Sequence, residues 1–336
     1  MEGMQSKPIT ILGAGSWGTA LALYLARRGQ TVKIWSYEIP EVAAMLAERT
    51  NNRYLPGFDF PDSIQPTANL ADALTNIDDA LIAVPSVGFR DTLIMIKPLI
   101  SANTRIVCAT KGLDEESGNL LNEVVTEVLG ADRPFAVLSG PSFAREVAAG
   151  LPTAVVIASN NTKFLGDLIK HFNSPIFRSY PSEDIKGVEI GGVVKNIIAI
   201  ATGMTDGMEY GANARCALIT QGLEEITRLG VALGANAETF VGLAGMGDLI
   251  LTCTDNQSRN RRLGLALGKG QHIDEAEKQI GQIVEGKRNA ELVTILADKL
   301  KVNMPICQMV WQVLQGKTSA KEGMKELLAT GEAVSA

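Results

Sequence analysis

The chain has 336 residues, of which 46% are apolar and 20% charged, which is typical of a folded globular protein with room for two domains. Its formal net charge of -6 gives no electrostatic reason to bind nucleic acid or an anionic membrane, and we expect neither partner. Any anionic substrate must therefore be attracted by a local cluster of positive charge.

The cysteines and histidines argue against two common kinds of site. The four cysteines are far apart, no CxxC pair occurs, and only two histidines are present. This pattern favours buried thiols in a reducing compartment over a disulfide framework or a zinc site, so we expect no metal. The apolar run Ile9–Leu12 is too short for a signal peptide, and no run of about 18 apolar residues suggests a membrane span. We expect a cytoplasmic protein.

The first half of the chain alternates short β-rich runs with helical segments. Five strands are expected here: Ile9–Leu12, Val32–Trp35, Ala80–Val84, Arg105–Ala109 and Phe135–Leu138. Such alternation is typical of a parallel sheet with helices on both faces. The apolar runs Ala154–Ala158 and Ile176–Tyr180 are expected to extend the sheet at one edge.

The segment GAGSWG at 13–18 fits a dinucleotide-binding turn, because it follows an expected strand and precedes an apolar helix at 19–26. Gly13 permits the tight turn, Gly15 lets the backbone approach a pyrophosphate, and Gly18 lets helix and strand pack closely. The helix N-terminus adds amide donors. An ordinary glycine-rich turn is the alternative, but the context favours a nicotinamide dinucleotide, NAD or NADP.

The residues after the second strand bear on the choice between these two cofactors. Glu38 lies 20 residues after Gly18, near the expected place of an acid that binds the ribose 2′-hydroxyl of NAD. No arginine lies in that loop to pair with the 2′-phosphate of NADP, although Arg53 could reach back. The residues alone therefore favour NAD.

The second half of the chain has long helical stretches and almost no strand-like alternation. Apolar residues recur at helical multiples within 213–233, and another helix is predicted at 290–300. We therefore predict an α/β protein with an N-terminal Rossmann-type, mostly parallel sheet and an all-helical C-terminal domain. The predicted domains are 1–188, which binds the dinucleotide, and 189–336, which binds substrate and carries the catalytic residues.

Reduction of a ketone needs a proton donor, and a lysine is the best candidate in this chain. Lys195 and Asn196 interrupt an apolar helix at 190–200. A buried, unpaired ammonium is costly, so Lys195 should be paired or line a cleft, and burial would lower its pKa. A lysine that extends from a core helix to solvent is the alternative. His171 and His272 are poorer candidates because both are expected at the surface.

A polar, basic segment, DNQSRNRR at 255–262, opens a predicted helix. Three arginines with Ser and Asn donors at a helix start could bind phosphate, although a solvated helix end is the alternative. Asp248 lies between a glycine and an apolar run and is either a site carboxylate or a helix N-cap. The segments 110–112 and 139–142 each follow a strand, at the edge where ligands of such sheets bind. Together these features favour a phosphorylated ketone or alcohol as substrate.

Over nearly its whole length the chain resembles the bacterial NAD(P)-dependent glycerol-3-phosphate dehydrogenases. The matching stretches are GAGSWGTALA, NRYLPG, VPS, ATKGL, SGPSFAREVAAGLPTA, GGVVKNIIAIATGM, GANARCALITQGL, AGMGDLILTCTDNQSRNRR and GQIVEG. The resemblance implies reversible conversion of dihydroxyacetone phosphate to sn-glycerol 3-phosphate, which supplies glycerophospholipid synthesis. We expect a homodimer formed through the helical domain.

The resemblance also implies roles for individual residues. Lys195 corresponds to the proton acceptor in oxidation and the donor in reduction, Thr252 to a helper beside it, and Lys111 and Asp248 to residues that stabilise charge and orient these groups. The substrate-contacting positions are Lys111, Gly140, Ser142, Asp248, Ser258, Arg259 and Asn260. The cofactor-lining positions are Gly13, Gly15, Ser16, Trp17, Gly18, Tyr37, Lys111, Ala144, Arg259, Ile283 and Glu285.

Two positions depart from the family pattern. Tyr37 stands where many relatives carry His or Arg, so a cation that could contact the 2′-phosphate of NADP is missing there. Ser142 replaces a frequent Thr but keeps the hydroxyl, so little consequence is expected.

Two other functions fit part of the pattern. Dehydrogenases of the 3-hydroxyacid or 6-phosphogluconate type also use a lysine in a helical domain, but the DNQSRNRR segment argues against them. A non-catalytic, dinucleotide-sensing protein should have lost Lys195 or the basic segment, and this chain keeps both.

Overall fold

The computed structural model describes residues 9–329, which form two compact units. Within the described range, unit 1 comprises residues 9–110 and 119–185, and unit 2 comprises residues 111–118 and 186–329. The short segment 111–118 follows a strand of unit 1 but packs with the helices of unit 2. The sequence predicts this segment as part of the N-terminal domain, because no local pattern distinguishes it and only long-range contacts assign it to unit 2.

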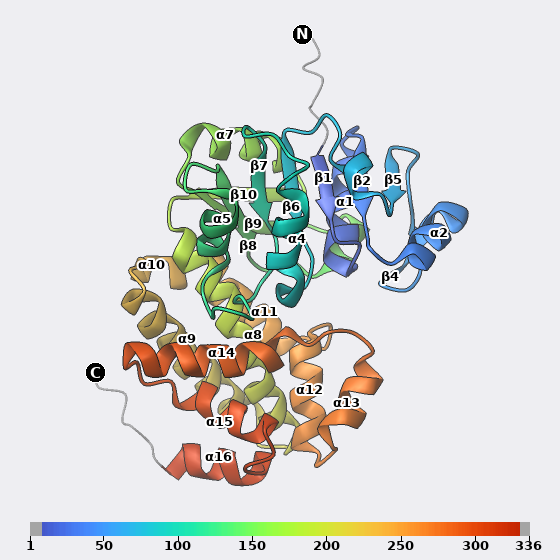
Figure 1. The fold of residues 1–336 in the computed structure, drawn as a ribbon. Coiled ribbons are helices and arrows are strands. Elements are labelled where there is room, and N and C mark those ends of the chain that lie inside the picture. The colour runs from blue at the N-terminus through green and yellow to red at the C-terminus, as the bar shows by residue number, and fades with distance from the viewer. Residues whose placement is uncertain (1–8, 330–336) are drawn as a thin grey trace. The chain divides into compact units, whose positions relative to one another are not determined.

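Unit 1 is built on an eight-stranded sheet with the order β10-β9-β8-β7-β6-β1-β2-β5 (Figure 1). The strands are β1 (Ile9–Leu12), β2 (Val32–Trp35), β5 (Ile64–Thr67), β6 (Asp79–Ile82), β7 (Arg105–Cys108), β8 (Phe135–Ser139), β9 (Thr153–Ser159) and β10 (Phe177–Ser182). Every neighbouring pair is parallel except β8 and β9. The prediction of a mostly parallel Rossmann-type sheet is therefore confirmed, with β9 and β10 at one edge.

Helices cover both faces of this sheet, which explains why its central strands are buried and apolar. The helices α1 (Ser16–Arg27), α6 (Ala144–Ala149) and α7 (Thr162–Phe172) share one hydrophobic core with the strands. The helices α4 (Phe89–Ile96) and α5 (Leu121–Leu129) pack against each other (Figure 1).

Several short elements of unit 1 were not predicted. The edge strand β5 contains Pro66, which weakens a strand pattern and is tolerated only where one side of the strand is unpaired. The strands β3 (Thr50–Asn51) and β4 (Leu55–Asp59) form a separate small antiparallel pair. The short helices α2 (Ile39–Glu48) and α3 (Leu70–Ala73) flank these strands along the chain.

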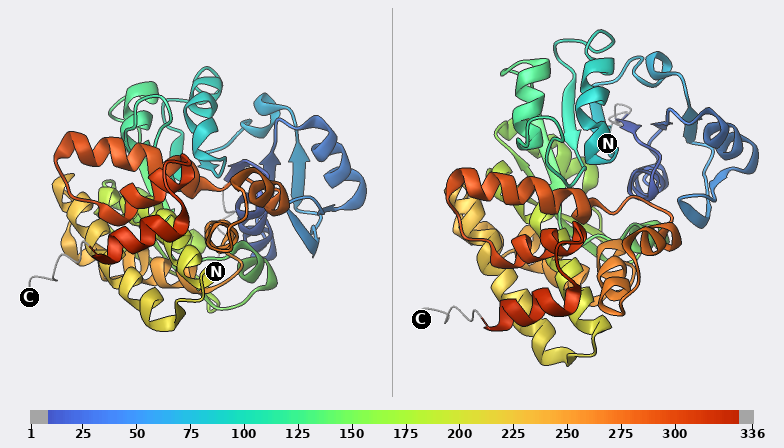
Figure 2. Two further views of the ribbon diagram at one scale, coloured as in Figure 1. Left: turned by 90° about the horizontal axis from the view of Figure 1, so that it is seen from below. Right: turned by 60° about the horizontal axis from the view of Figure 1, so that its bottom comes forward.

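Within the described residues, every regular element of unit 2 is a helix, and the segment 111–118 contains neither helix nor strand (Figures 1 and 2). Its helices are α8 (Ile185–Gly207), α9 (Gly211–Ala232), α10 (Ala237–Phe240), α11 (Asp248–Thr254), α12 (Arg259–Gly268), α13 (Ile273–Ile280), α14 (Glu285–Leu300), α15 (Pro305–Leu314) and α16 (Ala320–Ala329), with a π-helical turn, η2, at Leu243–Gly247. Along the chain, α14, α15 and α16 each pack on the next. The predicted helical C-terminal part is therefore confirmed.

The long helix α8 is the core of unit 2. By length and hydropathy it could cross a membrane, a property that the sequence analysis overlooked, but its most apolar stretch is entirely buried inside the protein. A Cβ atom on Gly203 would lie 2.2 Å from the carbonyl oxygen of Arg261, and one on Gly264 would lie 2.0 Å from that of Ile200. Because only glycine fits at such positions, the backbones of α8 and α12 lie in direct contact.

The four cysteines are free thiols. Cys108, Cys253 and Cys307 are buried, as expected, and burial raises the pKa of Cys253 to about 12. Cys216 is exposed on α9, so the expectation of a buried thiol was wrong there. Residues 211–217 in the first turns of α9 are all exposed or half-buried, so Cys216 lies on a part of the helix that faces solvent.

Candidate active site

The glycine turn of unit 1 has the geometry that the sequence predicts. Gly13 has a φ of +113°, a conformation that residues with a side chain rarely adopt, and its N–H donates to the carbonyl of Trp35 at 2.9 Å. A Cβ atom on Gly18 would lie 1.9 Å from the carbonyl oxygen of Gly13. These two glycines therefore let α1 begin directly against the end of β1.

The third glycine of the turn leaves room for a ligand. No atom lies within 4 Å of the place where a Cβ atom of Gly15 would be. The indole Nε1 of Trp17 is buried and has no hydrogen-bond partner among the described residues. Open space beside a helix start and an orphaned donor both fit a bound pyrophosphate, so the turn can hold a dinucleotide.

A loop that precedes β4 fixes the turn from outside. The hydroxyl of Ser16 donates to the carbonyl of Tyr54 at 2.6 Å. Asn51, which is buried, donates to the carbonyl of Ala14 at 2.7 Å and to the hydroxyl of Thr19 at 2.9 Å. Asn51 was not predicted as a site residue, because no local sequence pattern indicates that it contacts the glycine turn more than 30 residues earlier in the chain.

The other predicted segments of unit 1 lie at the carboxyl ends of neighbouring strands. The hydroxyl of Thr110, after β7, donates to the carbonyl of Val84, after β6, at 2.7 Å. After β8, Gly140 has a φ of +134°, and its carbonyl accepts from the hydroxyl of Ser142 at 2.9 Å. Ala144 begins α6, which packs on α1. These segments therefore share one edge of the sheet with the glycine turn.

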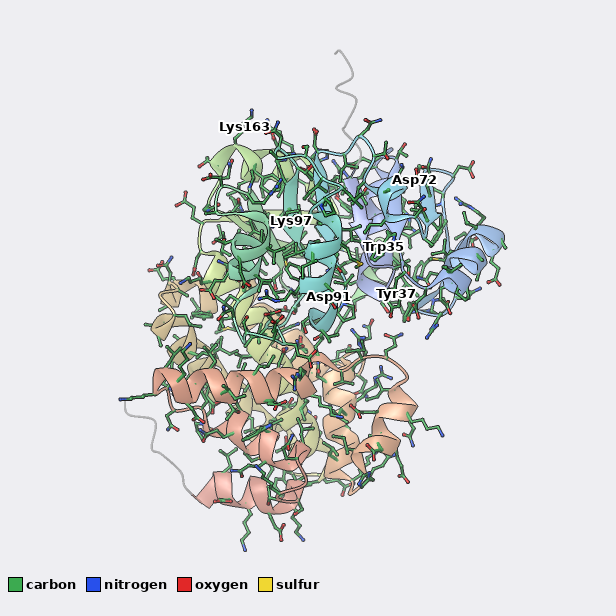
Figure 3. All side chains as sticks on the ribbon, in the orientation of Figure 1. Trp35, Tyr37, Asp72, Asp91, Lys97 and Lys163 are labelled. Atoms are coloured by element: carbon green, nitrogen blue, oxygen red, sulfur yellow. The ribbon has the colours of Figure 1, made fainter. Side chains whose placement is uncertain are left out.

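The loop after β2 places an acid beside an arginine and a tyrosine. Glu38 accepts from the hydroxyl of Tyr54 at 2.9 Å and pairs with Arg53 at 3.3 Å. Arg53 also pairs with Glu41 at 2.5 Å. Arg53 therefore does return to the loop after β2, as the sequence allowed, but its partners there are carboxylates. Tyr37, labelled with Trp35 in Figure 3, is 75% exposed. The negative charge of Glu38 is therefore only partly neutralised, because Glu38 shares Arg53 with Glu41.

In unit 2, Lys195 forms the centre of a buried cluster. Its Nζ donates to Asp248 Oδ1 at 2.6 Å and to the hydroxyl of Thr252 at 2.9 Å. That hydroxyl in turn donates to the backbone carbonyl of Asp248 at 2.6 Å. Lys111 donates to the other carboxylate oxygen, Oδ2, at 2.7 Å. Four residues predicted as catalytic therefore meet around one carboxylate.

These contacts decide two questions that the sequence left open. Lys195 is only 6% exposed, so it does not extend from its helix to solvent. Gly247 is the N-cap of α11 and Asp248 is its first residue, so the Asp248 carboxylate is not the helix cap and instead accepts from the two lysines. A Cβ atom on Gly191 would lie 2.3 Å from the carbonyl oxygen of Ala244. This glycine lets η2 approach α8 closely, and η2 leads directly into Asp248.

Burial and charge set the pKa values of the cluster. Burial lowers the pKa of Lys195 to about 8; Asp248 opposes this shift and the ammonium of Lys111 adds to it. Burial alone would raise the pKa of Asp248, but the two ammonium groups outweigh it and hold that pKa below its usual value. The cluster therefore combines a fixed carboxylate with a lysine that can gain or lose a proton near neutral pH.

The three arginines in the DNQSRNRR segment have different surroundings, and Arg259 lies closest to the helix N-terminus. It begins α12, is partly buried, and donates to Gln282 at 3.3 Å. Burial lowers its pKa, and Glu285 offsets part of this effect. Arg261 is buried among protein partners and therefore does not face a ligand, whereas Arg262 is exposed. Ser258 caps α12 by accepting from the N–H of Arg261.

Asn260 links this segment to two other elements. Its Nδ2 donates to Asn196 Oδ1 at 2.8 Å, and its Oδ1 accepts from the N–H of Gly286 at 2.9 Å. Asn196 directly follows Lys195, and Glu285 begins α14. The predicted substrate residue therefore joins the helix of the lysine to the first turn of α14, which contains Glu285 and directly follows the loop that carries Ile283.

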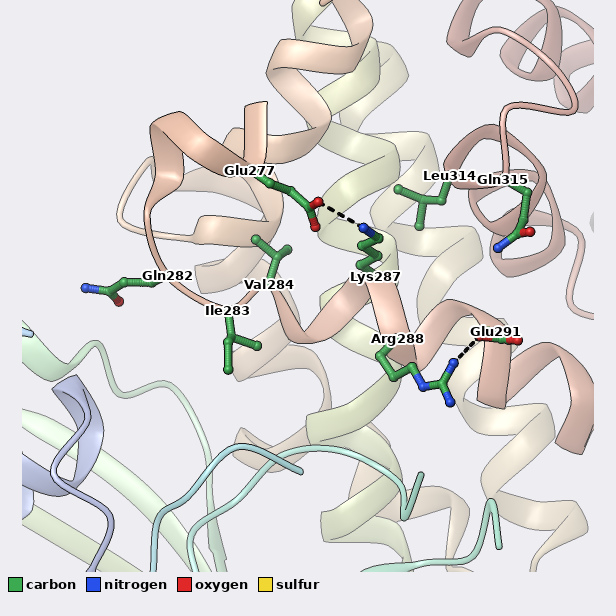
Figure 4. A pocket seen from close by; sticks show the side chains of 9 residues that line it. All are labelled: Glu277, Gln282, Ile283, Val284, Lys287, Arg288, Glu291, Leu314 and Gln315. Carbon is green, nitrogen blue, oxygen red and sulfur yellow. Dashed lines mark hydrogen bonds and ion pairs between the residues drawn. The ribbon is translucent and has the colours of Figure 1, made fainter. Parts of the chain in front are cut away.

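An open cleft of about 300 Å³ lies beside this loop (Figure 4). Ile283, Lys287 and Arg288 are among its lining residues, while Lys195, Asp248 and Arg259 are not. Its cations already have partners: Lys287 pairs with Glu277 at 2.9 Å, and Arg288 pairs with Glu291 and Glu115. The cleft is therefore separate from the lysine cluster.

Neither histidine belongs to a candidate site. His272 is exposed, as expected. His171 is half-buried, contrary to expectation, and lies 3.3 Å from the side-chain nitrogen of Gln30. Within residues 9–329, no group of three or more His, Cys, Asp or Glu side chains is arranged to hold a metal ion.

Unit 1 has a Rossmann sheet with room for a pyrophosphate at its glycine turn, and unit 2 has a lysine suited to proton transfer. This combination defines the class of nicotinamide-dependent, two-domain dehydrogenases. Family models for the N-terminus and the C-terminus of NAD-dependent glycerol-3-phosphate dehydrogenase match residues 8–165 and 184–325. The chain therefore belongs to the NAD-dependent glycerol-3-phosphate dehydrogenase family.

Individual relatives agree with this assignment. The chain is 51% identical to a glycerol-3-phosphate dehydrogenase [NAD(P)+] of Tolumonas auensis, over 95% of this chain and 96% of that protein. It is also 51% identical to the enzyme of the same name from Shewanella sediminis, over 95% of each chain. The crystal structure of glycerol-3-phosphate dehydrogenase from Coxiella burnetii is 52% identical with a TM-score of 0.94, covering 96% of this chain and 98% of that one.

Proposed function

We propose that this protein catalyses the reversible reduction of dihydroxyacetone phosphate to sn-glycerol 3-phosphate with NADH or NADPH. The buried Lys195, held by Asp248 and Thr252, is the observation that carries this proposal. The family and the printed names of the relatives support the choice of substrate and cofactor.

The first task of the protein is to hold its two ligands. In the proposed arrangement, residues 1–188 bind the dinucleotide, with Gly13–Gly18 at its pyrophosphate and Ser16, Trp17, Tyr37 and Ala144 along it. Residues 189–336, with Lys111, bind the substrate. The proposed phosphate site is Arg259 and the start of α12, with Ser258 and Asn260, since guanidinium groups and helix N-termini bind phosphate well. The family resemblance adds Gly140 and Ser142 to the proposed substrate residues and Ile283 and Glu285 to the proposed cofactor residues.

The second task is to move a proton. The bound dinucleotide supplies the hydride that reduces the C2 carbonyl carbon. As negative charge develops on the carbonyl oxygen, Lys195 Nζ donates a proton to it, and Lys111 stabilises the charge. Asp248 and Thr252 hold the ammonium in place, so no reorganisation is needed at that moment. In the reverse direction, neutral Lys195 accepts the proton of the C2 hydroxyl.

A substrate panel tests this function directly. Purified protein should oxidise NADH or NADPH when dihydroxyacetone phosphate is added, as followed by absorbance, and should be inactive with 3-hydroxyacids and 6-phosphogluconate in the reverse direction. Activity only with those compounds would favour the related dehydrogenases. Binding of NADH without any turnover would favour a dinucleotide sensor.

Three further expectations extend this proposal. Supply of glycerophospholipid synthesis follows from the product, since sn-glycerol 3-phosphate is the backbone of these lipids. The four cysteines, which are free thiols, support a location in a reducing compartment such as the cytoplasm. A homodimer through the helical unit is our expectation for the assembly, and light scattering after size-exclusion chromatography measures it.

A further inference from the structure

Arg261 belongs to the basic DNQSRNRR segment, yet its guanidinium faces the protein interior. The residue is 7% exposed, and each of its side-chain nitrogens has a partner. Nε donates to the carbonyl of Cys253 at 3.0 Å, Nη1 donates to Asn256 Oδ1, and Nη2 donates to Asp206 at 2.5 Å. Arg261 therefore joins the last turn of α11, the α11–α12 loop and the end of α8.

Arg215 of α9 holds Asp206 from a second side. Its Nη1 lies 2.9 Å from each oxygen of the Asp206 carboxylate. The side chain of Arg215 is 29% exposed, whereas those of Asp206 and Arg261 are 10% and 9% exposed. We call this chain of three charges, Arg215–Asp206–Arg261, the arginine clamp.

Two members of the arginine clamp carry charges that interact unfavourably with the dipoles of their own helices. Asp206 lies in the last turn of α8, near the negative end of the helix dipole. Arg261 lies in the first turn of α12, near the positive end. A sequence that breaks a local rule at two helix ends is expected to do so for a functional site.

The arginine clamp contacts the α11–α12 loop, which lies between two groups of proposed site residues. Asp248 and Thr252 lie on α11, before the loop, and Ser258 and Arg259 begin α12, after it. Arg261 contacts the last turn of α11 at the carbonyl of Cys253 and the loop itself at Asn256. Because a displacement of about 1 Å can cost about 100-fold in rate, the geometry of this loop should matter for catalysis.

We propose that Asp206 and Arg215 are positioning residues for the substrate phosphate. Through Arg261 they hold the α11–α12 loop in the geometry in which Arg259 can bind a phosphate monoester. The proposal rests on the proposed function for the identity of the substrate, but the arginine clamp would act on any phosphate at Arg259. It also gives a role to Arg215, the charged residue of the GANARCALITQGL segment.

Kinetics of Arg215→Ala, Arg215→Lys and Arg228→Ala test this proposal. Arg228 is the matched control, because it lies on the same helix and makes an ion pair, with Glu224 at 4.0 Å. Arg215→Ala should raise KM for dihydroxyacetone phosphate roughly threefold to tenfold, with kcat within about twofold and the Kd of NADH unchanged. Arg215→Lys should recover part of this loss, and Arg228→Ala should change none of these constants.

Binding of inorganic phosphate keeps this proposal separate from the proposed function. At constant ionic strength, phosphate should raise the Tm of the wild type and of Arg228→Ala more than that of Arg215→Ala, whatever the wild type does with dihydroxyacetone phosphate. If Arg215→Ala fails to fold, Arg215→Gln, which keeps most of the side chain without its charge, gives the same comparison.

Two results would overturn the role of the arginine clamp. One is an Arg215 variant with the KM and the phosphate response of the wild type. The other is an equal rise of KM in the Arg215 and Arg228 variants together with equal losses of Tm. Absence of wild-type turnover with dihydroxyacetone phosphate, while the phosphate responses still differ as expected, would contradict the proposed function and support the clamp.

Discussion

The two candidate sites of this protein use different chemical groups, backbone in one and charged side chains in the other. The turn at 13–18 is made of backbone, with Gly13 and Gly18 packed closely and open space beside Gly15. The cluster in unit 2 is made of side chains, with two ammonium groups on one buried carboxylate. The first can hold a ligand through amide groups with little charge of its own. The lysine cluster concentrates charged groups around Lys195, the residue proposed to transfer the proton.

This difference predicts that the two sites can be damaged independently. Changes at the glycine turn should weaken cofactor binding, and changes at the lysine cluster should lower turnover or substrate affinity. Substitutions at one site at a time test that separation.

Loss of Lys195 should have the largest effect. Lys195→Ala should lower kcat about 10³-fold, because general acid–base groups contribute on that scale. The Kd of NADH, measured by fluorescence titration, should stay unchanged, since the glycine turn is intact. Lys195→Arg is the matched control: it keeps a cation beside Asp248 but cannot release its proton, so it should be nearly as inactive. Turnover near that of the wild type in either variant would remove Lys195 from its proposed role.

Arg259→Ala should chiefly weaken substrate binding. A charge-assisted contact to phosphate contributes about 1.5–3 kcal/mol, which corresponds to a rise of roughly tenfold to hundredfold in KM for dihydroxyacetone phosphate. Arg262→Ala, an exposed arginine on the same helix, should leave KM within about twofold of the wild type. Equal KM values for the two variants would contradict the assignment of the phosphate to Arg259.

Gly15→Val should damage only the cofactor site. The new side chain fits the fold, because nothing lies within 4 Å of its Cβ position, but it fills the space proposed for the pyrophosphate. The Kd of NADH should rise about tenfold or more, which corresponds to about 1.4 kcal/mol, with little change in Tm. Gly166→Val, at an equally open position in α7, should bind NADH normally. Normal NADH binding by Gly15→Val would contradict the proposed site.

Glu38→Gln should shift the choice of cofactor. Near the surface, a carboxylate repels a 2′-phosphate by about 1 kcal/mol, so its removal should raise the ratio of kcat/KM for NADPH to that for NADH about fivefold. Glu41→Gln, which also loses a contact to Arg53, controls for effects through that arginine. An unchanged ratio in Glu38→Gln would show that this acid does not face the ribose.

The sequence predicted the glycine turn better than the lysine cluster, for a physical reason. The turn needs only a strand, three glycines and a helix within 13–18 and its flanks, all of which are local. The cluster joins Lys111 to Asp248 across 137 positions and Lys195 to Asp248 across 53. Residue patterns alone suggested Lys195 as a buried charge, and only the family resemblance connected it to its partners.

Other features could not be predicted because they depend on packing at a distance. Arg261 and Arg262 look equivalent beside Arg259, and only the fold turns Arg261 toward Asp206. The assignment of segment 111–118 to unit 2 depends on contacts with the helices. Strand β5 was missed because Pro66 interrupts its pattern, a residue that an edge strand tolerates.

The pH dependence of both directions of the reaction tests most directly whether Lys195 transfers the proton. Its pKa of about 8 means that the ammonium predominates below that pH and the neutral amine above it. Reduction of dihydroxyacetone phosphate needs the ammonium, so its kcat/KM should fall as the pH rises through about 8. Oxidation of glycerol 3-phosphate needs the amine, so its kcat/KM should rise over the same range and then level off. Opposite profiles that cross near this pH would support Lys195 as the proton-transfer residue, and profiles that are flat there in both directions would contradict it.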